Sequence, residues 1–207
     1  ERATRPHHHA GHEQTGHDGE STSRAHPSTN GTGRYPPAVT SQSPHVAVVG
    51  ASDALAADLA VAEDLGRELA ARGAVVVCGG LGGVMEAVCR GARSAGGTTV
   101  GILPGDDRRH ANPHVSVAVA TGLGEGRNLI IIRTADVVIA VGGEFGTLSE
   151  IAFALRLGTP VIGIATWELA RAGGRPVDAI HRVDTAAEAA DTALTTAQAI
   201  LRSTTSE

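Results

Sequence analysis

Three glycine-rich stretches in the sequence are suited to hold a small anion: Gly50-Ala51-Ser52, residues 79–83 and residues 142–147. Glycine lets the backbone approach a phosphate closely and adopt positive φ. The second and third stretches each precede an expected helix, whose free N–H groups and positive dipole end attract an anion. Two such turns facing one crevice predict a phosphorylated small ligand. The predicted phosphate- or nucleotide-binding residues are Gly142, Gly143, Gly146, Thr147, Ser52, Gly80, Gly82 and Gly83.

Each glycine-rich stretch also has a purely structural interpretation. Tight strand-to-helix turns use glycine in any case, and neither longer stretch has the G-x-G-x-x-G spacing of dinucleotide sites. The run from Thr147 to Glu150 fits a capping box, with Thr147 as N-cap and Glu150 bonding back to its N–H. On that interpretation Glu150 only caps a helix, and Phe145 is an ordinary loop anchor.

Apolar runs that alternate with amphipathic stretches must position these loops. Strands buried on both faces are expected at residues 45–50, 74–78, 98–103, 136–141 and 159–164, with a weaker one at 115–120. Helices are expected at residues 54–72, 84–95, 125–134, 147–157 and 186–202. Strands separated by helices indicate βαβ units, so the predicted fold is α/β, a Rossmann-like doubly wound parallel sheet in a single domain. Ligands bind at the carboxyl ends of such strands, where the glycine-rich stretches lie.

Composition excludes several classes of function. All 17 basic residues are arginine, so a Walker-A phosphate loop and pyridoxal-phosphate chemistry, which both need lysine, are excluded. A net charge of −5 and four aromatic residues argue against nucleic-acid binding. Two cysteines in apolar surroundings predict reduced core thiols rather than a zinc site. Neither a signal peptide nor an apolar run of roughly 20 residues is present, so we expect no membrane contact and a cytoplasmic location.

Residues 1–43 differ from the rest in composition. They are rich in His, Ser, Thr, Gly and Pro and contain six of the ten histidines. Such a stretch buries too little apolar surface to offset its ordering entropy, so we expect a disordered leader before a domain at residues 44–207. A metal-binding His tail and an over-extended translation start are the alternatives for this leader.

Residues 142–150, GGEFGTLSE, resemble the PGGxGTxxE signature of the LOG ("lonely guy") family. That family comprises cytokinin riboside 5′-monophosphate phosphoribohydrolases that were long mislabelled as lysine decarboxylases. Its arginine that pairs with the signature glutamate matches Arg127, 23 residues before Glu150. Residues 79–105 resemble the family's second glycine loop and its G-x-x-P strand end. The resemblance covers about residues 45–165.

Four positions depart from the LOG pattern. Val141 replaces the signature proline, Phe145 a tyrosine, Asn128 a lysine and Glu86 a small residue. These features resemble the LOG-like proteins and molybdenum-cofactor carriers that share the fold. The absence of lysine separately excludes lysine decarboxylation for this chain.

The resemblance implies hydrolysis of the N-glycosidic bond of a nucleoside 5′-monophosphate, which releases a nucleobase and ribose 5-phosphate. The phosphate would rest on the N–H groups of Gly143, Gly146 and Thr147. Glu150 would stabilise the oxocarbenium-like transition state or activate water. Arg127 would clamp phosphate or hold Glu150 ionised through a bidentate pair, with a structural ion pair as the alternative.

The remaining expectations concern partners and secondary site residues. Ser52 and residues 80–83 would border the base or ribose, and Trp167 would pack against the C-terminal helix. The resemblance implies a homodimer, and no metal or cofactor is expected. The alternative function is a non-catalytic carrier or sensor that binds molybdenum cofactor or another phosphorylated ligand.

Overall fold

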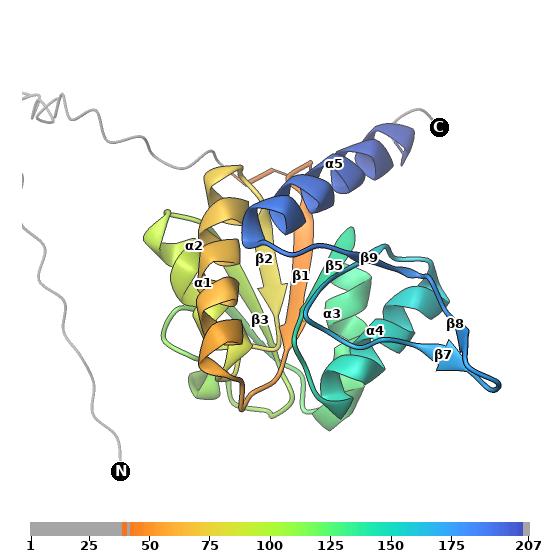
Figure 1. Cartoon of the computed structure of the whole chain (residues 1–207). Helices are drawn as coiled ribbons and strands as arrows, with labels where there is room; N and C mark the ends of the chain where they lie inside the picture. Colours follow the sequence, from red (N-terminus) through yellow and green to blue (C-terminus); the bar gives the residue numbers. More distant parts are fainter. Residues whose placement is uncertain (1–38, 41, 205–207) are drawn as a thin grey trace, which may run out of the picture. The chain divides into compact units, whose positions relative to one another are not determined.

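The computed structural model describes residues 39–40 and 42–204. The leader predicted at residues 1–43 lies almost entirely outside the described residues. Residues 42–204 contain one seven-stranded sheet, one two-stranded hairpin and the helices that cover the sheet (Figure 1).

All seven strands of the sheet run parallel, in the spatial order β4-β3-β2-β1-β5-β6-β9. From β1 the chain moves outward to β4 on one side, then returns to β5, which pairs with the other side of β1. The point between β1 and β5 is therefore the topological switch of a doubly wound sheet, where ligands bind in such folds. The strands are β1 (His45–Gly50), β2 (Val75–Cys78), β3 (Thr99–Leu103), β4 (Val117–Ala120), β5 (Val137–Val141), β6 (Val161–Ile164) and β9 (Ile180–Arg182).

Helices cover both faces of the sheet, as the continuous apolar strands require. Helices α1 (Ala56–Ala71), α2 (Val84–Ser94) and α5 (Ala186–Thr204) share one buried cluster with Val46 and Val48 of β1. Helices α3 (Asn128–Thr134) and α4 (Phe145–Leu157) share a second cluster with Ala47 and Val49. Alternate side chains of β1 thus pack into two hydrophobic cores, one on each face of the sheet. The predicted α/β doubly wound fold is confirmed.

Helices α1 and α2 pack with their backbones in close approach. A Cβ on Gly66 would lie 2.1 Å from the carbonyl oxygen of Val88, and one on Gly91 would lie 1.9 Å from that of Glu63. No side chain larger than hydrogen fits at either position, so two glycines set the distance between these helices. The position of α2 matters because its first residue, Val84, donates its N–H to the carbonyl of Ala51 in the loop after β1 (3.0 Å).

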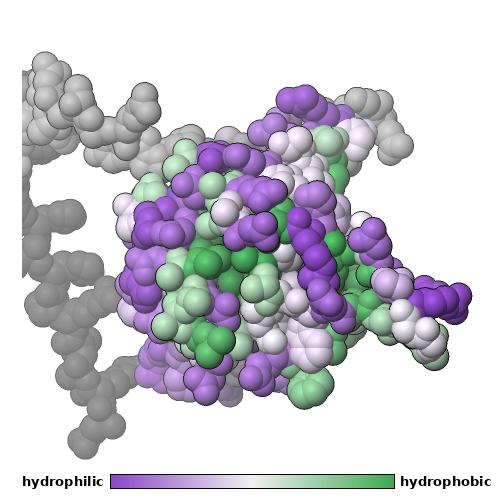
Figure 2. Space-filling model, in the orientation of Figure 1, coloured by the Kyte–Doolittle hydropathy of each residue, from purple (hydrophilic) through white to green (hydrophobic). Residues whose placement is uncertain are grey.

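The structure adds elements that the sequence pattern did not predict. Strands β7 (Ala170–Arg171) and β8 (Arg175–Pro176) form a hairpin that projects from the sheet and ends in a hydrophilic tip (Figures 1 and 2). Strand β9 was also missed because only Ile180 of its three residues is buried, which leaves no periodic signal.

Short 3-10 helices lie at η1 (Arg108–His110) and η2 (Gly124–Arg127), and η2 replaces the first turn of the helix expected at 125–134. Among the described residues, no helix is long and apolar enough to cross a membrane.

Candidate functional site

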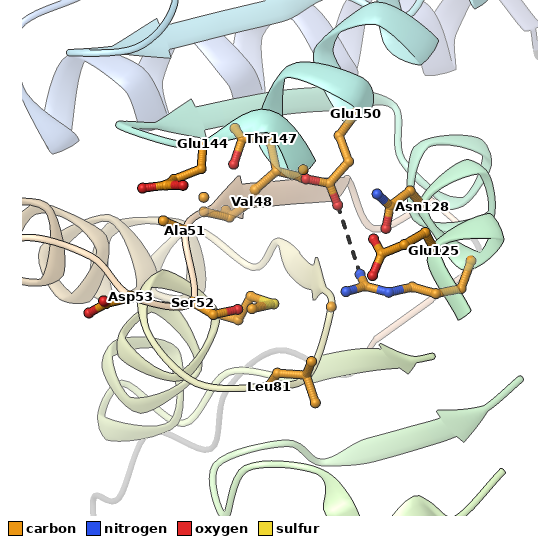
Figure 3. Close-up of a pocket in the computed structure, with 16 residues that line it drawn as sticks. Val48, Ala51, Ser52, Asp53, Leu81, Glu125, Asn128, Glu144, Thr147 and Glu150 are labelled. Carbon is orange, nitrogen blue, oxygen red and sulfur yellow. Dashed lines mark ion pairs between the residues drawn. The ribbon is translucent and has the colours of Figure 1, made fainter. Parts of the chain in front are cut away.

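A pocket of about 380 Å³ lies at the carboxyl ends of β1, β2 and β5, at the topological switch (Figure 3). The loop after β1 contributes Ser52 and Asp53, the loop after β2 contributes Gly79 and Leu81, and η2 with α3 contributes Glu125, Arg127 and Asn128. The start of α4 contributes Glu144, Gly146, Thr147 and Glu150. Residues that are distant in sequence therefore meet in one cavity.

The structure brings together five of the predicted site residues in this pocket: Ser52, Arg127, Gly146, Thr147 and Glu150. Gly142 and Gly143 line a neighbouring pocket of about 540 Å³, which shares Ala51, Asp53 and Glu144 with the first.

Of the second glycine-rich stretch, Gly79 and Leu81 line the first pocket, whereas Gly80, Gly82 and Gly83 lie outside its lining. Gly83 has a φ of 64°, and a Cβ there would lie 2.3 Å from the carbonyl oxygen of Ala51. Only glycine therefore fits at this position, where the loop after β2 packs against the loop after β1.

Helix α4 begins two residues earlier than expected. Its N-cap is Glu144, whose side chain makes no capping hydrogen bond, and the first helical bond runs from the N–H of Leu148 to the carbonyl of Glu144 (2.9 Å). The capping-box prediction for Thr147 and Glu150 is therefore wrong. Positive φ values at Gly142 (55°) and Gly143 (115°) let the chain turn into the helix early.

The early start of α4 puts two of its features at the pocket. Thr147 is buried in the first turn, and Glu150 faces the pocket from the second (Figure 3). The N–H groups of Phe145, Gly146 and Thr147 have no acceptor within the helix.

Arg127 and Glu150 form a buried ion pair. Nη1 of Arg127 lies 3.8 Å from Oε1 of Glu150, and the two side chains are only 7% and 9% exposed. This distance exceeds that of a hydrogen bond, and the contact is single rather than the bidentate pair expected. A Cβ on Gly79 would lie 2.3 Å from Nη1, so this glycine makes room for the guanidinium.

The described residues contain three buried side-chain nitrogen or oxygen atoms without a hydrogen-bond partner: Nε and Nη1 of Arg127 and Oδ1 of Asn128. All three belong to consecutive residues that line the same pocket. Unpartnered buried polar atoms are costly to a folded protein, so their concentration here indicates groups kept for a ligand.

Burial controls the charge of Glu150. Loss of solvation raises the pKa of Glu150 to about 7; nearby Arg127 opposes this shift and Glu125 adds to it. The carboxyl group is therefore partly protonated near neutral pH, although an arginine lies beside it. A carboxyl with such a pKa can both take and give a proton under physiological conditions.

Trp167 lines the second pocket and packs against Phe145. The ring of Trp167 lies 5.6 Å from that of Phe145, and Nε1 of Trp167 donates to the carbonyl of Glu144 (3.2 Å). The expectation that Trp167 packs against the C-terminal helix is therefore wrong. Phe145 is 77% exposed, so it is not a buried loop anchor. This pair had no sequence signal because 22 residues separate its members.

Two features lie apart from the pocket lining. Cys78 and Cys89 are free and buried, with their sulfur atoms 3.4 Å apart, as expected of core thiols. Glu86 lies on the first turn of α2, where a negative charge is favourable. Among the described residues, no group of three or more His, Cys, Asp and Glu side chains is arranged to hold a metal ion.

Comparison with known proteins places this geometry in context. The model of the family described as "SLOG cluster4 family" matches residues 43–198. A curated relative from Archaeoglobus fulgidus, described as an uncharacterized protein, is 41% identical over 119 residues, which are 58% of this chain and 78% of the relative.

Several solved structures resemble the chain over most of their length. The molybdenum cofactor binding protein of the phototrophic bacterium Rippkaea orientalis has a TM-score of 0.68 and 34% identity, covering 75% of this chain and 98% of that one. The molybdenum cofactor carrier protein of Chlamydomonas reinhardtii has a TM-score of 0.66 and 32% identity, covering 74% and 98%. DNA processing protein A of Helicobacter pylori shares the fold alone, with a TM-score of 0.56 and 20% identity.

Proposed function

The chain belongs to the SLOG cluster4 family, and from that premise we propose that its pocket at the topological switch binds a phosphorylated small molecule. One observation carries the proposal: Arg127 is buried, and its Nε and Nη1 have no hydrogen-bond partner among the described residues. A phosphate accepts a hydrogen bond from one of these nitrogens and neutralises the buried charge. The free N–H groups at the start of α4, including those of Gly146 and Thr147, add to the same anion site.

The charges in the pocket limit the kind of ligand. One arginine lines the pocket together with four carboxyl groups, those of Asp53, Glu125, Glu144 and Glu150. Protonation of Glu150 near neutral pH reduces this negative charge at the point where the anion binds. A ligand with a single phosphate and an uncharged remainder suits these charges, whereas each further phosphate adds repulsion. Nucleoside monophosphates and the organic part of molybdenum cofactor both carry one phosphate.

The leading activity is reversible binding, with the protein as a carrier of molybdenum cofactor. It is supported by solved neighbours that are named as binding or carrier proteins for this cofactor and that are matched over 97–98% of their chains. The test incubates the full chain with molybdenum cofactor released from a molybdoenzyme, then measures molybdenum per protein after gel filtration. We expect about one molybdenum per protein chain in the protein fraction, and we expect an excess of AMP to lower this ratio. Molybdenum that stays in the small-molecule fraction would contradict the carrier.

The second candidate activity is hydrolysis of a nucleoside 5′-monophosphate. It is favoured by Glu150, whose pKa of about 7 suits proton transfer beside Arg127. The N-glycosidic bond breaks, water adds to the ribose carbon, and the base leaves with a proton. Glu150 would remove the proton from that water or stabilise the positive charge on the ribose.

Chromatography of free base tests the hydrolase directly. The full chain is incubated with AMP and with cytokinin-type monophosphates. Hydrolysis is supported if the unaltered chain releases base and Glu150→Gln releases none but still binds the nucleotide. Bound nucleotide with no base released from any substrate rejects it and leaves the carrier.

A further inference from the structure

Arg127 accounts for two of the three unpartnered buried atoms in the described part of the chain, and both are donors. The third, Oδ1 of Asn128, is an acceptor, and a fully ionised phosphate ester, which has no hydrogen to donate, cannot satisfy it. On the basis of the proposed function, we propose that Asn128 is a specificity-determining residue. Its Oδ1 accepts a hydrogen bond from an N–H or O–H group that the ligand carries beside its phosphate.

The neighbouring hydroxyl fixes which end of the Asn128 amide faces the pocket. Oγ of Ser149 donates its single hydrogen to the carbonyl of Gly146 (2.7 Å), so it can only accept from Asn128. Nδ2 of Asn128 donates to this oxygen at 3.2 Å. A flipped amide would set two oxygen acceptors against each other. The hydrogen-bond chain from Gly146 through Ser149 therefore holds Oδ1 away from Ser149 and leaves it without a partner.

Burial and location give this acceptor its selectivity. Asn128 is 3% exposed and lines the same pocket as Arg127, the residue before it (Figure 3). Solvent therefore competes little for Oδ1, and a ligand that brings no donor leaves it unsatisfied. The carboxyl groups of Glu125 and Glu150 line the same pocket, so acceptors predominate around the guanidinium. A ligand that carries donors beside its phosphate matches this surface.

The shared chemistry is a hydrogen-bond donor close to a phosphate, and two ligand classes supply it. In a nucleotide the donor is a ribose hydroxyl, and in the molybdenum cofactor it is a ring N–H. The sequence hides this role because Asn128 and Ser149 lie 21 residues apart and meet only through the packing of α3 on α4.

The test titrates the full chain at pH 8 with methyl phosphate, which is then fully ionised and serves as the phosphate probe, and with AMP, 2′-deoxy-AMP, 3′-deoxy-AMP and molybdenum cofactor. The variants are Asn128→Leu, which removes the acceptor, and Ser149→Ala, which frees the amide to rotate. Ser94→Ala is the matched control, because its hydroxyl also donates to a carbonyl three residues earlier (2.7 Å) but lies on α2, outside the pocket.

We expect Asn128→Leu to weaken binding of AMP or of the cofactor about tenfold or more, with phosphate affinity changed less than about twofold. Ser149→Ala should give a smaller loss of the same kind and Ser94→Ala none. If Asn128→Leu loses affinity for AMP but not for one of the deoxy analogues, the missing ribose hydroxyl of that analogue is the donor. If the variant loses affinity for the cofactor, the donor is a ring N–H. The melting temperature of free Asn128→Leu should not fall, because an unsatisfied acceptor has been removed.

Equal loss for phosphate and for the larger ligands would overturn the inference, because Asn128 would then only position Arg127. Unchanged affinity for the larger ligands in both variants would overturn it as well, while the proposed function stands. If the unaltered chain binds none of the five probes, the proposed function fails and this inference fails with it.

Discussion

Arg127 and Glu150 are a buried pair in which neither residue satisfies the other. Burial removes the solvation that would keep Glu150 ionised, and one contact of 3.8 Å with Arg127 does not restore it. Arg127 in turn keeps two unpartnered nitrogens because its carboxyl partner lies beyond hydrogen-bond distance. Both residues are thus strained electrostatically in the free protein, which is the pattern expected of a ligand site rather than of a structural ion pair.

The raised pKa of Glu150 predicts a pH-dependent stability. The folded-state pKa of about 7 lies above the ordinary value of 4.5, so between these pH values the folded protein holds a proton that the unfolded chain has released. The free energy of unfolding should therefore fall as the pH rises from about 4.5 to 7, by about 3 kcal/mol at most.

Urea unfolding of Glu150→Gln between pH 5 and 8 tests this. The glutamine resembles the protonated carboxyl, so this variant should lose most of the dependence of the unfolding free energy on pH. Glu168 is exposed and lies outside the pocket, so Glu168→Gln should keep that dependence. A slope in Glu150→Gln equal to that of the unaltered chain would show that Glu150 titrates normally.

Gly79→Ala should displace Arg127. Its Cβ would lie 2.3 Å and 2.6 Å from Nη1 and Nη2, so the guanidinium must move away from the anion site. We expect affinity for phosphorylated ligands to fall about tenfold or more, at a cost in stability of about 1–2 kcal/mol. Gly105→Ala, where a Cβ meets nothing within 4 Å, is the control for titration calorimetry and unfolding. Equal ligand affinity in both variants would contradict the placement of Arg127.

Elements position this pair through the order of the strands and the spacing of the helices. The reversal between β1 and β5 opens the crevice, and α4 begins where β5 ends. Helix α2 fixes the loop after β1 through Val84, and its own position depends on contact with α1 at Gly66 and Gly91. The site therefore depends on a helix interface that contributes only one residue, Met85 of α2, to the lining of the pocket.

Gly91→Ala tests that dependence on helix spacing. Its Cβ would lie 1.9 Å from the carbonyl oxygen of Glu63, so α1 and α2 must separate. We expect the free energy of unfolding to fall by about 3 kcal/mol, well beyond the effect of alanine at Gly105. Denaturant unfolding measures this difference. A loss below about 1 kcal/mol would mean that the helices adjust without strain.

The sequence predicted the elements well where a pattern was continuous. Apolar runs gave β1, β2, β3, β5 and β6 to within two residues, because strands buried on both faces leave an unbroken signal. The start of α4 was wrong because positive φ at Gly142 and Gly143 decides it, and no periodicity reports such a turn. Gly79 and the hydrogen bond from Asn128 to Ser149 were missed because each depends on how distant segments pack.

At the scale of the whole molecule, charge and surface set how ligands and partners meet the protein. Residues 1–43 contain four arginines and four acidic residues, so the net charge of −5 belongs to residues 44–207. An acidic protein without lysine must hold an anion locally, with backbone N–H groups and a placed arginine. Figure 2 shows hydrophobic residues between hydrophilic ones over α1 and α5, and exposed Val117 and Val119 lie on the edge strand β4.

The resemblance to LOG proteins predicts a homodimer, which would also cover exposed apolar side chains. Multi-angle light scattering of the full chain should give the mass of two 20.9 kDa chains across a tenfold range of protein concentration. The mass of a single chain throughout that range would contradict the dimer without affecting the site within one chain.

Titration of Arg127→Met tests the central claim most directly. Molybdenum cofactor and AMP are each titrated into the unaltered chain, Arg127→Met and Arg133→Met, the last being an exposed arginine on α3 outside the pocket. Loss of the two charged donors should weaken binding about a hundredfold, while free Arg127→Met unfolds no earlier than the unaltered chain. Arg133→Met should bind like the unaltered chain. Ligand affinity that survives in Arg127→Met would show that this pocket does not hold the phosphate.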